Sequence, residues 1–254
     1  LPYRLERLRG AVAFSGDEAR LEHLHARHGR AEVELTGGVR GGLSHGTYDI
    51  RGEVRNVPLD EEFRRALPER FDRVWRDLSP RGETSLGFRV HKDEPDGSPH
   101  LSAKVLLEGD CAMTYRGFPY PLDRLYGEVR LTGDSVAIDS VRGRNGAMSC
   151  TIDGRIDRLH SGKAEVDLNV EVAALPLDET LLEAVSDKAR SVMESLHATG
   201  AAETVSARVR KSGGKPLDYR ILARVRGAAF RPDVFPYPVA DAEGVLTIAR
   251  ERVV

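Results

Sequence analysis

A short motif of proline, tyrosine and glycine recurs along this sequence at a constant interval, and it constrains the fold more than any other feature. The motif closes at Gly10, Gly127 and Gly244, so the closing glycines are separated twice by 117 residues. Self-similarity at a fixed period indicates structural units that stack on their neighbours. We therefore expect the chain to be a segment of a longer array. It comprises one repeat unit at 1–117, a second at 118–234 and the start of a third at 235–254.

Turn residues divide the first unit into short segments with the spacing of antiparallel strands. Ser15-Gly16-Asp17, His28-Gly29 and Thr36-Gly37-Gly38 each follow a stretch that contains apolar residues. Such punctuation at intervals of roughly ten residues is typical of antiparallel sheet. The six strands that we expect in the first unit are 12–14, 20–27, 31–35, 47–56, 83–91 and 100–108.

Apolar and polar residues alternate most regularly in the second unit. The period of two runs through 163–172, 205–210 and 219–226, with Leu222 as the exception. Because successive side chains of a strand point to opposite faces, each strand has one apolar and one charged face. The apolar residues that we expect to share one face are Val166, Leu168, Val170, Val172, Val205, Val209, Tyr219, Ile221 and Val225.

One amphipathic helix is expected in each unit, beginning at Asp60 in the first and at Asp178 in the second. Acidic residues follow both aspartates, which suits an N-cap and the positive end of the helix dipole. Apolar residues then recur at helical spacing over about five turns. Pro68 should break or kink the first helix, because proline lacks an amide donor and clashes with the preceding turn. Gly82 and Gly200 are the expected stops.

Six strands present more apolar surface than one helix can cover. Neighbouring strands lie about 4.8 Å apart and a helix is about 10 Å wide, so one helix covers only a few strands. The rest of the apolar face needs another cover, because a large exposed apolar surface favours aggregation. Two solutions remain open. Either the sheet closes on itself around a filled core, or it stays an open trough whose apolar face meets an apolar ligand.

Three features of the repeat are distinctive. They are the Pro-Tyr-Pro box that leads to Gly127, the strand ending in Asp153-Gly154-Arg155-Ile156, and Leu175-Pro176-Leu177-Asp178 before a helix. Together they resemble the repeats of the bacterial AsmA-like proteins, the group that includes TamB and YhdP. The resemblance covers essentially the whole chain. It implies a mainly β fold in which tandem repeats of curved antiparallel sheet form an open groove, with one amphipathic helix per repeat.

The resemblance also implies a function and a location. Proteins of that family are periplasmic, are usually anchored in the inner membrane, and are thought to carry phospholipid tails in an apolar groove towards the outer membrane. For this chain it implies phospholipids or other acyl lipids and neighbouring repeat units as partners, with proteins of both membranes as further partners. It implies no catalytic residue, metal or cofactor. The nine apolar residues named above would line the groove.

Composition and charge leave two other classes of function open. Hydrophobic residues make up 40% and charged residues 31% of the chain, as in folded globular proteins. A net charge of −2 predicts no strong attraction to nucleic acid. A structural β-repeat protein of the cell envelope with a closed, filled core is the alternative to lipid transfer. A carbohydrate-acting enzyme ranks last, because the acidic residues form no special pair across a cleft.

Cysteine and histidine side chains are candidates for metal or redox chemistry. Cys111 and Cys150 fall at different places in the repeat and match no zinc spacing, so isolated buried thiols are favoured over a disulfide. His23, His25 and His28 are close in sequence, but the second unit has no histidine at the corresponding positions. A solvated polar face is therefore favoured over a metal site.

Arginines gather on the polar side of the last strands of the second unit. This basic face could meet phosphate headgroups or nucleic acid, and it comprises Arg208, Arg210, Arg220, Arg224 and Arg226. If the strands are neighbours, cross-strand ion pairs with acidic residues of the preceding strand are the favoured interpretation. Those acidic residues are Glu165, Asp167 and Glu171.

The aromatic residues of the repeated motif lie where units meet. Phe118 and Tyr120 are each followed by a proline, which fixes the backbone and suits a sheet edge or a crossover. We expect a packing role for these two residues, and for Phe235 and Tyr237 of the next copy, rather than a contact with lipid.

Overall fold

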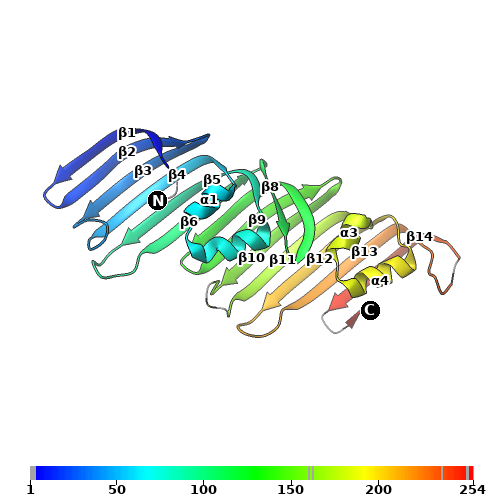
Figure 1. Cartoon of the computed structure of the whole chain (residues 1–254). Coiled ribbons are helices and arrows are strands. Elements are labelled where there is room, and N and C mark those ends of the chain that lie inside the picture. Colours follow the sequence, from blue (N-terminus) through cyan, green and yellow to red (C-terminus); the bar gives the residue numbers. More distant parts are fainter. Residues whose placement is uncertain (1–3, 160, 162, 236, 250–251, 254) are drawn as a thin grey trace.

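The protein is mainly β, as the alternation predicts, and its strands form one long antiparallel sheet (Figure 1). The computed structural model describes residues 4–159, 161, 163–235, 237–249 and 252–253. Residues 1–3 of the first motif copy and Pro236 of the third lie outside these described residues. The strands are β1 (Glu6–Ser15), β2 (Glu18–His28), β3 (Ala31–Arg40), β4 (Thr47–Pro58), β5 (Arg81–Lys92), β6 (His100–Glu108), β7 (Cys111–Tyr115), β8 (Phe118–Thr132), β9 (Ser135–Asn145), β10 (Met148–Asp157), β11 (Glu165–Pro176), β12 (Ala201–Lys211), β13 (Asp218–Phe230), β14 (Val239–Ala249) and β15 (Arg252–Val253).

Fourteen of these strands follow one another across the sheet in sequence order. The path runs from β1 to β6 and from β8 to β15, while the short β7 lies off it and pairs with β5 and β8. β6 pairs with β8 from Ser102↔Thr132 to Glu108↔Tyr126, so the sheet continues across the predicted unit boundary. Within the described residues the path begins at β1 and ends at β15 without joining them. The sheet is therefore open.

Secondary structure recurs at the interval of the sequence motif. β9 begins and ends 117 residues after β2, and β11 begins and ends 118 residues after β4. Left-handed backbone recurs in the same way, with φ of 54° at Arg7 and 51° at Arg124, and of 46° at His23 and 47° at Ser140. The two units therefore share their irregular backbone as well as their strands.

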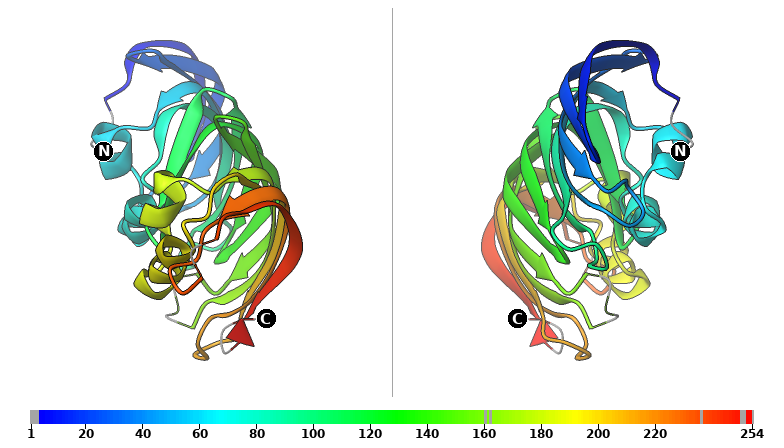
Figure 2. Two further views of the ribbon diagram at one scale, coloured as in Figure 1. Left: turned by 90° about the vertical axis from the view of Figure 1, so that its right-hand side faces the viewer. Right: turned by 90° about the vertical axis from the view of Figure 1, so that its left-hand side faces the viewer.

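These left-handed residues mark β-bulges, and the bulges bend the sheet. The register of β1 on β2 shifts between Glu6 and Arg9, around Arg7, and that of β8 on β9 shifts between Asp123 and Tyr126. A bulge bends its strand and increases the local twist. Bulges at equivalent positions therefore curve successive units in the same direction. Figure 2 shows the resulting curved sheet, with the helices on its concave side.

A pair of short helices takes the place of the single helix expected in each unit. The first pair is α1 (Glu61–Ala66) and α2 (Asp72–Leu78), with the 3₁₀ turn η1 (Glu69–Phe71) between them, and the second is α3 (Glu179–Ala184) and α4 (Asp187–Leu196). The break expected at Pro68 is confirmed. The prediction of a continuous helix in the second unit is wrong. Val185 is extended (φ −82°, ψ 165°), and Ser186 caps α4 because its hydroxyl accepts a hydrogen bond from the Ala189 amide.

The helices also end at residues other than the expected glycines. Ser79 and His197 follow the last helical residues, with left-handed φ of 42° and 44°. Gly82 lies inside β5, and Gly200 lies just before β12. A left-handed residue at the helix end is the expected C-terminal signal, but serine and histidine adopt this conformation here in place of glycine.

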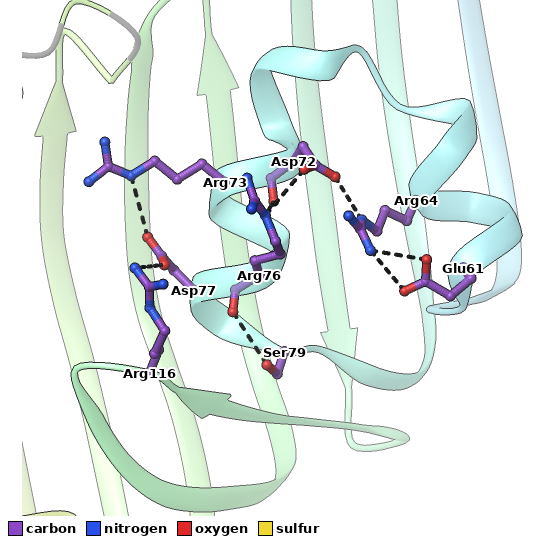
Figure 3. Close-up of polar contacts among 8 residues, drawn as sticks. All are labelled: Glu61, Arg64, Asp72, Arg73, Arg76, Asp77, Ser79 and Arg116. Atoms are coloured by element: carbon purple, nitrogen blue, oxygen red, sulfur yellow. Dashed lines mark hydrogen bonds and ion pairs between the residues drawn. The ribbon is translucent and has the colours of Figure 1, made fainter.

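Arg64 holds the first helix pair together across its break (Figure 3). Its Nε donates to Asp72 Oδ1 at 2.7 Å, and its Nη1 donates to both carboxylate oxygens of Glu61. At the end of α2, the carboxylate of Asp77 lies 2.8 Å from the guanidinium of Arg116, in the turn between β7 and β8. The Arg116 amide also donates to the Asp77 carbonyl. The helix pair of the first unit is thereby attached to the turn that precedes β8, the first strand of the second unit.

The repeated aromatic motif belongs to a hairpin that the sequence did not predict. β7 pairs with the beginning of β8, with Tyr115 opposite Phe118. Tyr120 is buried, which confirms the packing role expected for it, while Phe118 stacks on Tyr120 and remains 41% exposed. In the next copy, Phe235 and Tyr237 lie against each other but are 60% and 67% exposed. The packing role is thus established for Tyr120 alone.

Two clusters of buried side chains lie on the sheet, and helix residues pack in each. Phe63 of α1 packs against the first cluster, which comprises Ala26, Ala31, Val33, Val54 and Val57. The second cluster includes Leu181 and Ala184 of α3 with Tyr120, Met148 and Cys150. Each helix pair therefore covers only the part of the sheet beneath it.

Candidate apolar binding face

All nine residues predicted to share the apolar face do so. They come from three neighbouring strands, β11, β12 and β13, and the register connects them. Leu168 lies opposite Val209, which lies opposite Tyr219. Val172 lies opposite Val205, and the remaining members occupy alternate positions of the same strands. Because side chains at paired positions project to the same side of a sheet, the nine form one patch.

The patch is part of a row that crosses both units. Starting from Leu168, the register partners on successive strands are apolar, apart from one glycine, over eleven strands from β2 to β13. We call this set the apolar row. Its members are Ala26, Val33, Val54, Leu86, Val105, Val129, Ile138, Gly154, Leu168, Val209 and Tyr219.

The apolar row is covered in one part and accessible in another. Ala26, Val33 and Val54 are buried in the cluster against which Phe63 packs. Val170 and Val172 of the predicted patch pack against the cluster that contains Leu181 and Ala184 of α3. Leu168, Val209 and Tyr219 belong to neither buried cluster and are half-buried. The uncovered part therefore presents a continuous apolar surface of the kind that marks a binding site.

The sequence patterns did not indicate the part of the apolar row that comes from the middle of the sheet. Leu86, Val105, Val129 and Ile138 occupy the apolar row on β5, β6, β8 and β9 and are absent from the predicted set. Alternation around Val129, between Glu128 and Arg130, was the available signal. It is shorter than the alternation of β11, and the bulges of β8 interrupt it.

The opposite face of the same strands carries charged side chains that are exposed to solvent. Arg208 donates to Asp167 across β11 and β12 at 3.2 Å, and Arg210 lies 3.5 Å from the same carboxylate. The hydrogen bond from Arg208 and the nearby guanidinium groups lower the pKa of Asp167. The predicted cross-strand ion pairs are confirmed for these three residues. Glu171 instead accepts a hydrogen bond from Ser206 at 2.6 Å.

The structure shows the surroundings of both cysteines and of His23. Cys111 and Cys150 are free and buried, as predicted, and burial raises the pKa of each thiol to about 11. His23 lies 2.8 Å from Glu34 on the exposed side of the sheet. The described residues contain no cluster of three or more histidine, cysteine or acidic side chains that could hold a metal ion. No described helix is both long and apolar enough to cross a bilayer.

No protein-family model, no curated protein and no solved structure matches the chain.

Proposed function

We propose that this chain binds the acyl chains of phospholipids on the uncovered part of its apolar face. In this proposal the tandem units form an open groove and serve as a segment of a periplasmic lipid-transfer bridge between the inner and outer membranes. The observation that carries it is the apolar row. It continues over eleven strands, and its members beyond the helices are only half-buried.

Simple energetics support a lipid over a small polar ligand. Moving a methylene from water to an apolar surface is worth about 0.8 kcal/mol, so a long acyl chain gains substantially from a surface of this length. The charged side chains of β11 and β12 lie on the opposite face, where Asp167 pairs with Arg208. Headgroups would stay in water at the open side of the trough. A uniform apolar surface without a deep pocket also lets a lipid move on, as weak sites do in ion channels.

Location and partners follow from the family resemblance. Similarity to AsmA-like repeats supports a periplasmic site, a parent protein anchored in the inner membrane, and contacts with membrane proteins at either end. Acyl lipids and neighbouring repeat units are the partners that the apolar surface and the continuous sheet support most directly. A structural repeat protein of the cell envelope is the alternative, and it predicts no bound lipid.

Native mass spectrometry after incubation with phospholipid tests the proposal. Leu168→Asp and Ile221→Asp each place a charge on the apolar face, and we expect both to abolish lipid adducts. Asn169→Asp adds the same charge to the exposed face of the same strand and is the matched control, which should retain the adducts. Circular dichroism verifies that each variant is folded. Unchanged adducts in the folded Leu168→Asp protein would exclude the proposed binding face.

A further inference from the structure

A small cavity that is open to solvent lies between the two helices of the second pair. Its volume is about 250 Å³, and it is lined by Leu177, Leu182, Met193, Glu194, His197 and Ala198. Leu177 lies between β11 and α3, Leu182 belongs to α3, and Met193 and Glu194 belong to α4. Leu177 and Met193 also pack against the buried cluster of the second unit. The cavity therefore lies between the helices and the end of a strand.

The first unit carries larger side chains at two of these positions. Trp75 precedes Met193 by 118 residues, the same interval that separates α1 from α3. Its ring lies 6.0 Å from that of Phe63. Arg64 precedes Leu182 by the same interval, and its guanidinium is engaged by Glu61 and Asp72. The second unit has replaced an indole by a thioether and an arginine by a leucine, and space remains between its helices.

The chemistry of the lining selects the ligand. Four lining residues are apolar, and the two polar ones, Glu194 and His197, lie together at the end of α4. His197 Nε2 is 2.9 Å from Asp233 Oδ1, so that imidazole already has a partner. The hollow therefore offers apolar contacts on one side, and on the other it opens to solvent beside two exposed polar side chains.

We propose that this cavity binds the end of a single uncharged aliphatic chain. The chain would lie against Leu177, Leu182 and Met193, with its polar end in water beside Glu194 and His197. The flexible thioether of Met193 suits a ligand without a fixed shape. A carboxylate at the mouth would lie near two acidic side chains, Glu194 and Asp233, so an alcohol is preferred over a fatty acid. This site is distinct from the proposed lipid groove, because none of its six lining residues belongs to the nine-residue patch.

Methyl NMR of methionine tests the proposal with linear alcohols of increasing length as probes. The chain has three methionines, Met113, Met148 and Met193, so each methyl signal is assignable. We expect the Met193 methyl to shift on titration while Met113 stays in place. Affinity should rise about fourfold per added methylene until the cavity is full. A Met193 signal that does not move, or an affinity that does not depend on chain length, would overturn the proposal.

Two variants and one control complete the experiment, with calorimetry as the readout. Met193→Trp restores the bulk of the first unit and should abolish alcohol binding. Val192→Trp adds the same indole at a neighbouring position that is 53% exposed, and should bind as the unaltered protein does. Met193→Ala enlarges the cavity and should move the best chain length upwards, which keeps the test valid if Met193→Trp does not fold. Equal binding by a folded Met193→Trp protein would place the alcohol elsewhere.

Discussion

Leu168 of β11 lies directly opposite Val209 of β12, and both side chains belong to the apolar face. The adjacent pair in the register, Asp167 and Arg210, projects to the other face, where Asp167 also binds Arg208. One residue along the strand therefore separates an apolar environment from an ionic one.

Acid should destabilise the protein partly through Asp167. Its pKa is lowered in the folded state, mainly by the hydrogen bond from Arg208, from an ordinary value of 3.8. The stabilisation is fully present above that ordinary value and is lost as the pH falls through the lowered folded pKa. Urea unfolding at pH 7 and pH 3 should show a smaller loss of stability in Asp167→Asn than in the unaltered protein. Equal losses in the two proteins would contradict the assigned role.

Gly154 should be far more sensitive to substitution than Gly133. Gly154 has φ of 142°, and a Cβ there would lie 2.2 Å from the carbonyl oxygen of Asp167 on the next strand. Gly133 has φ of 60° and no atom within 4 Å of an added Cβ. Gly133→Ala should therefore cost about 1 kcal/mol for left-handed backbone alone, and Gly154→Ala more than about 2 kcal/mol. Denaturant unfolding measures both, and similar costs would contradict the close strand approach.

Leu181 should contribute strongly to stability, since it joins α3 to the sheet. Its side chain is 6% exposed and belongs to the buried cluster with Tyr120, Met148 and Cys150. Leu181→Ala should lower the free energy of unfolding by about 2–5 kcal/mol. Val192→Ala, on the exposed side of α4, should change it by less than about 0.5 kcal/mol. If Leu181→Ala has as little effect as the control, α3 does not pack on the sheet.

Cys150 should react slowly with alkylating reagents until the protein unfolds. Its pKa of about 11 compares with 9.0 for an ordinary thiol, so thiolate at neutral pH is about 100-fold scarcer. Mass spectrometry after iodoacetamide treatment should show alkylation at Cys150 only when urea is present. Rapid labelling of the folded protein would show that the thiol is accessible.

Sequence patterns predicted the strands well because the relevant physical rule is local. The alternation from Ala164 to Val172 requires only that successive side chains point to opposite faces, and β11 obeys it up to Val172, before the left-handed residue Ala174. Pro68 likewise interrupts its helix for a reason contained in its own ring. The break at Val185 escaped prediction because Leu182, Val185 and Ala189 keep helical spacing across it, although Ser186 followed by Asp187 is a typical cap.

The curvature and extent of the apolar face could not be predicted in the same way. Arg7, His23 and Ser140 adopt left-handed backbone, yet nothing in an arginine, histidine or serine marks a bulge in the sequence. Each bulge shifts the phase of alternation, which hid Val129 and Ile138 from the predicted patch. The pairing of strands in the sheet determines where the bulges lie. The positions of Val129 and Ile138 on the apolar face therefore follow only from the structure.

The central claim is that acyl chains contact the apolar face and not the ionic one. A photo-reactive amino acid placed in turn at positions 166, 167, 168 and 169 of β11, irradiated with phospholipid vesicles, tests it most directly. Lipid adducts should form at 166 and 168 and be absent at 167 and 169, following the alternation of Val166 and Leu168 with Asp167 and Asn169. Adducts at all four positions, or at none, would contradict the account.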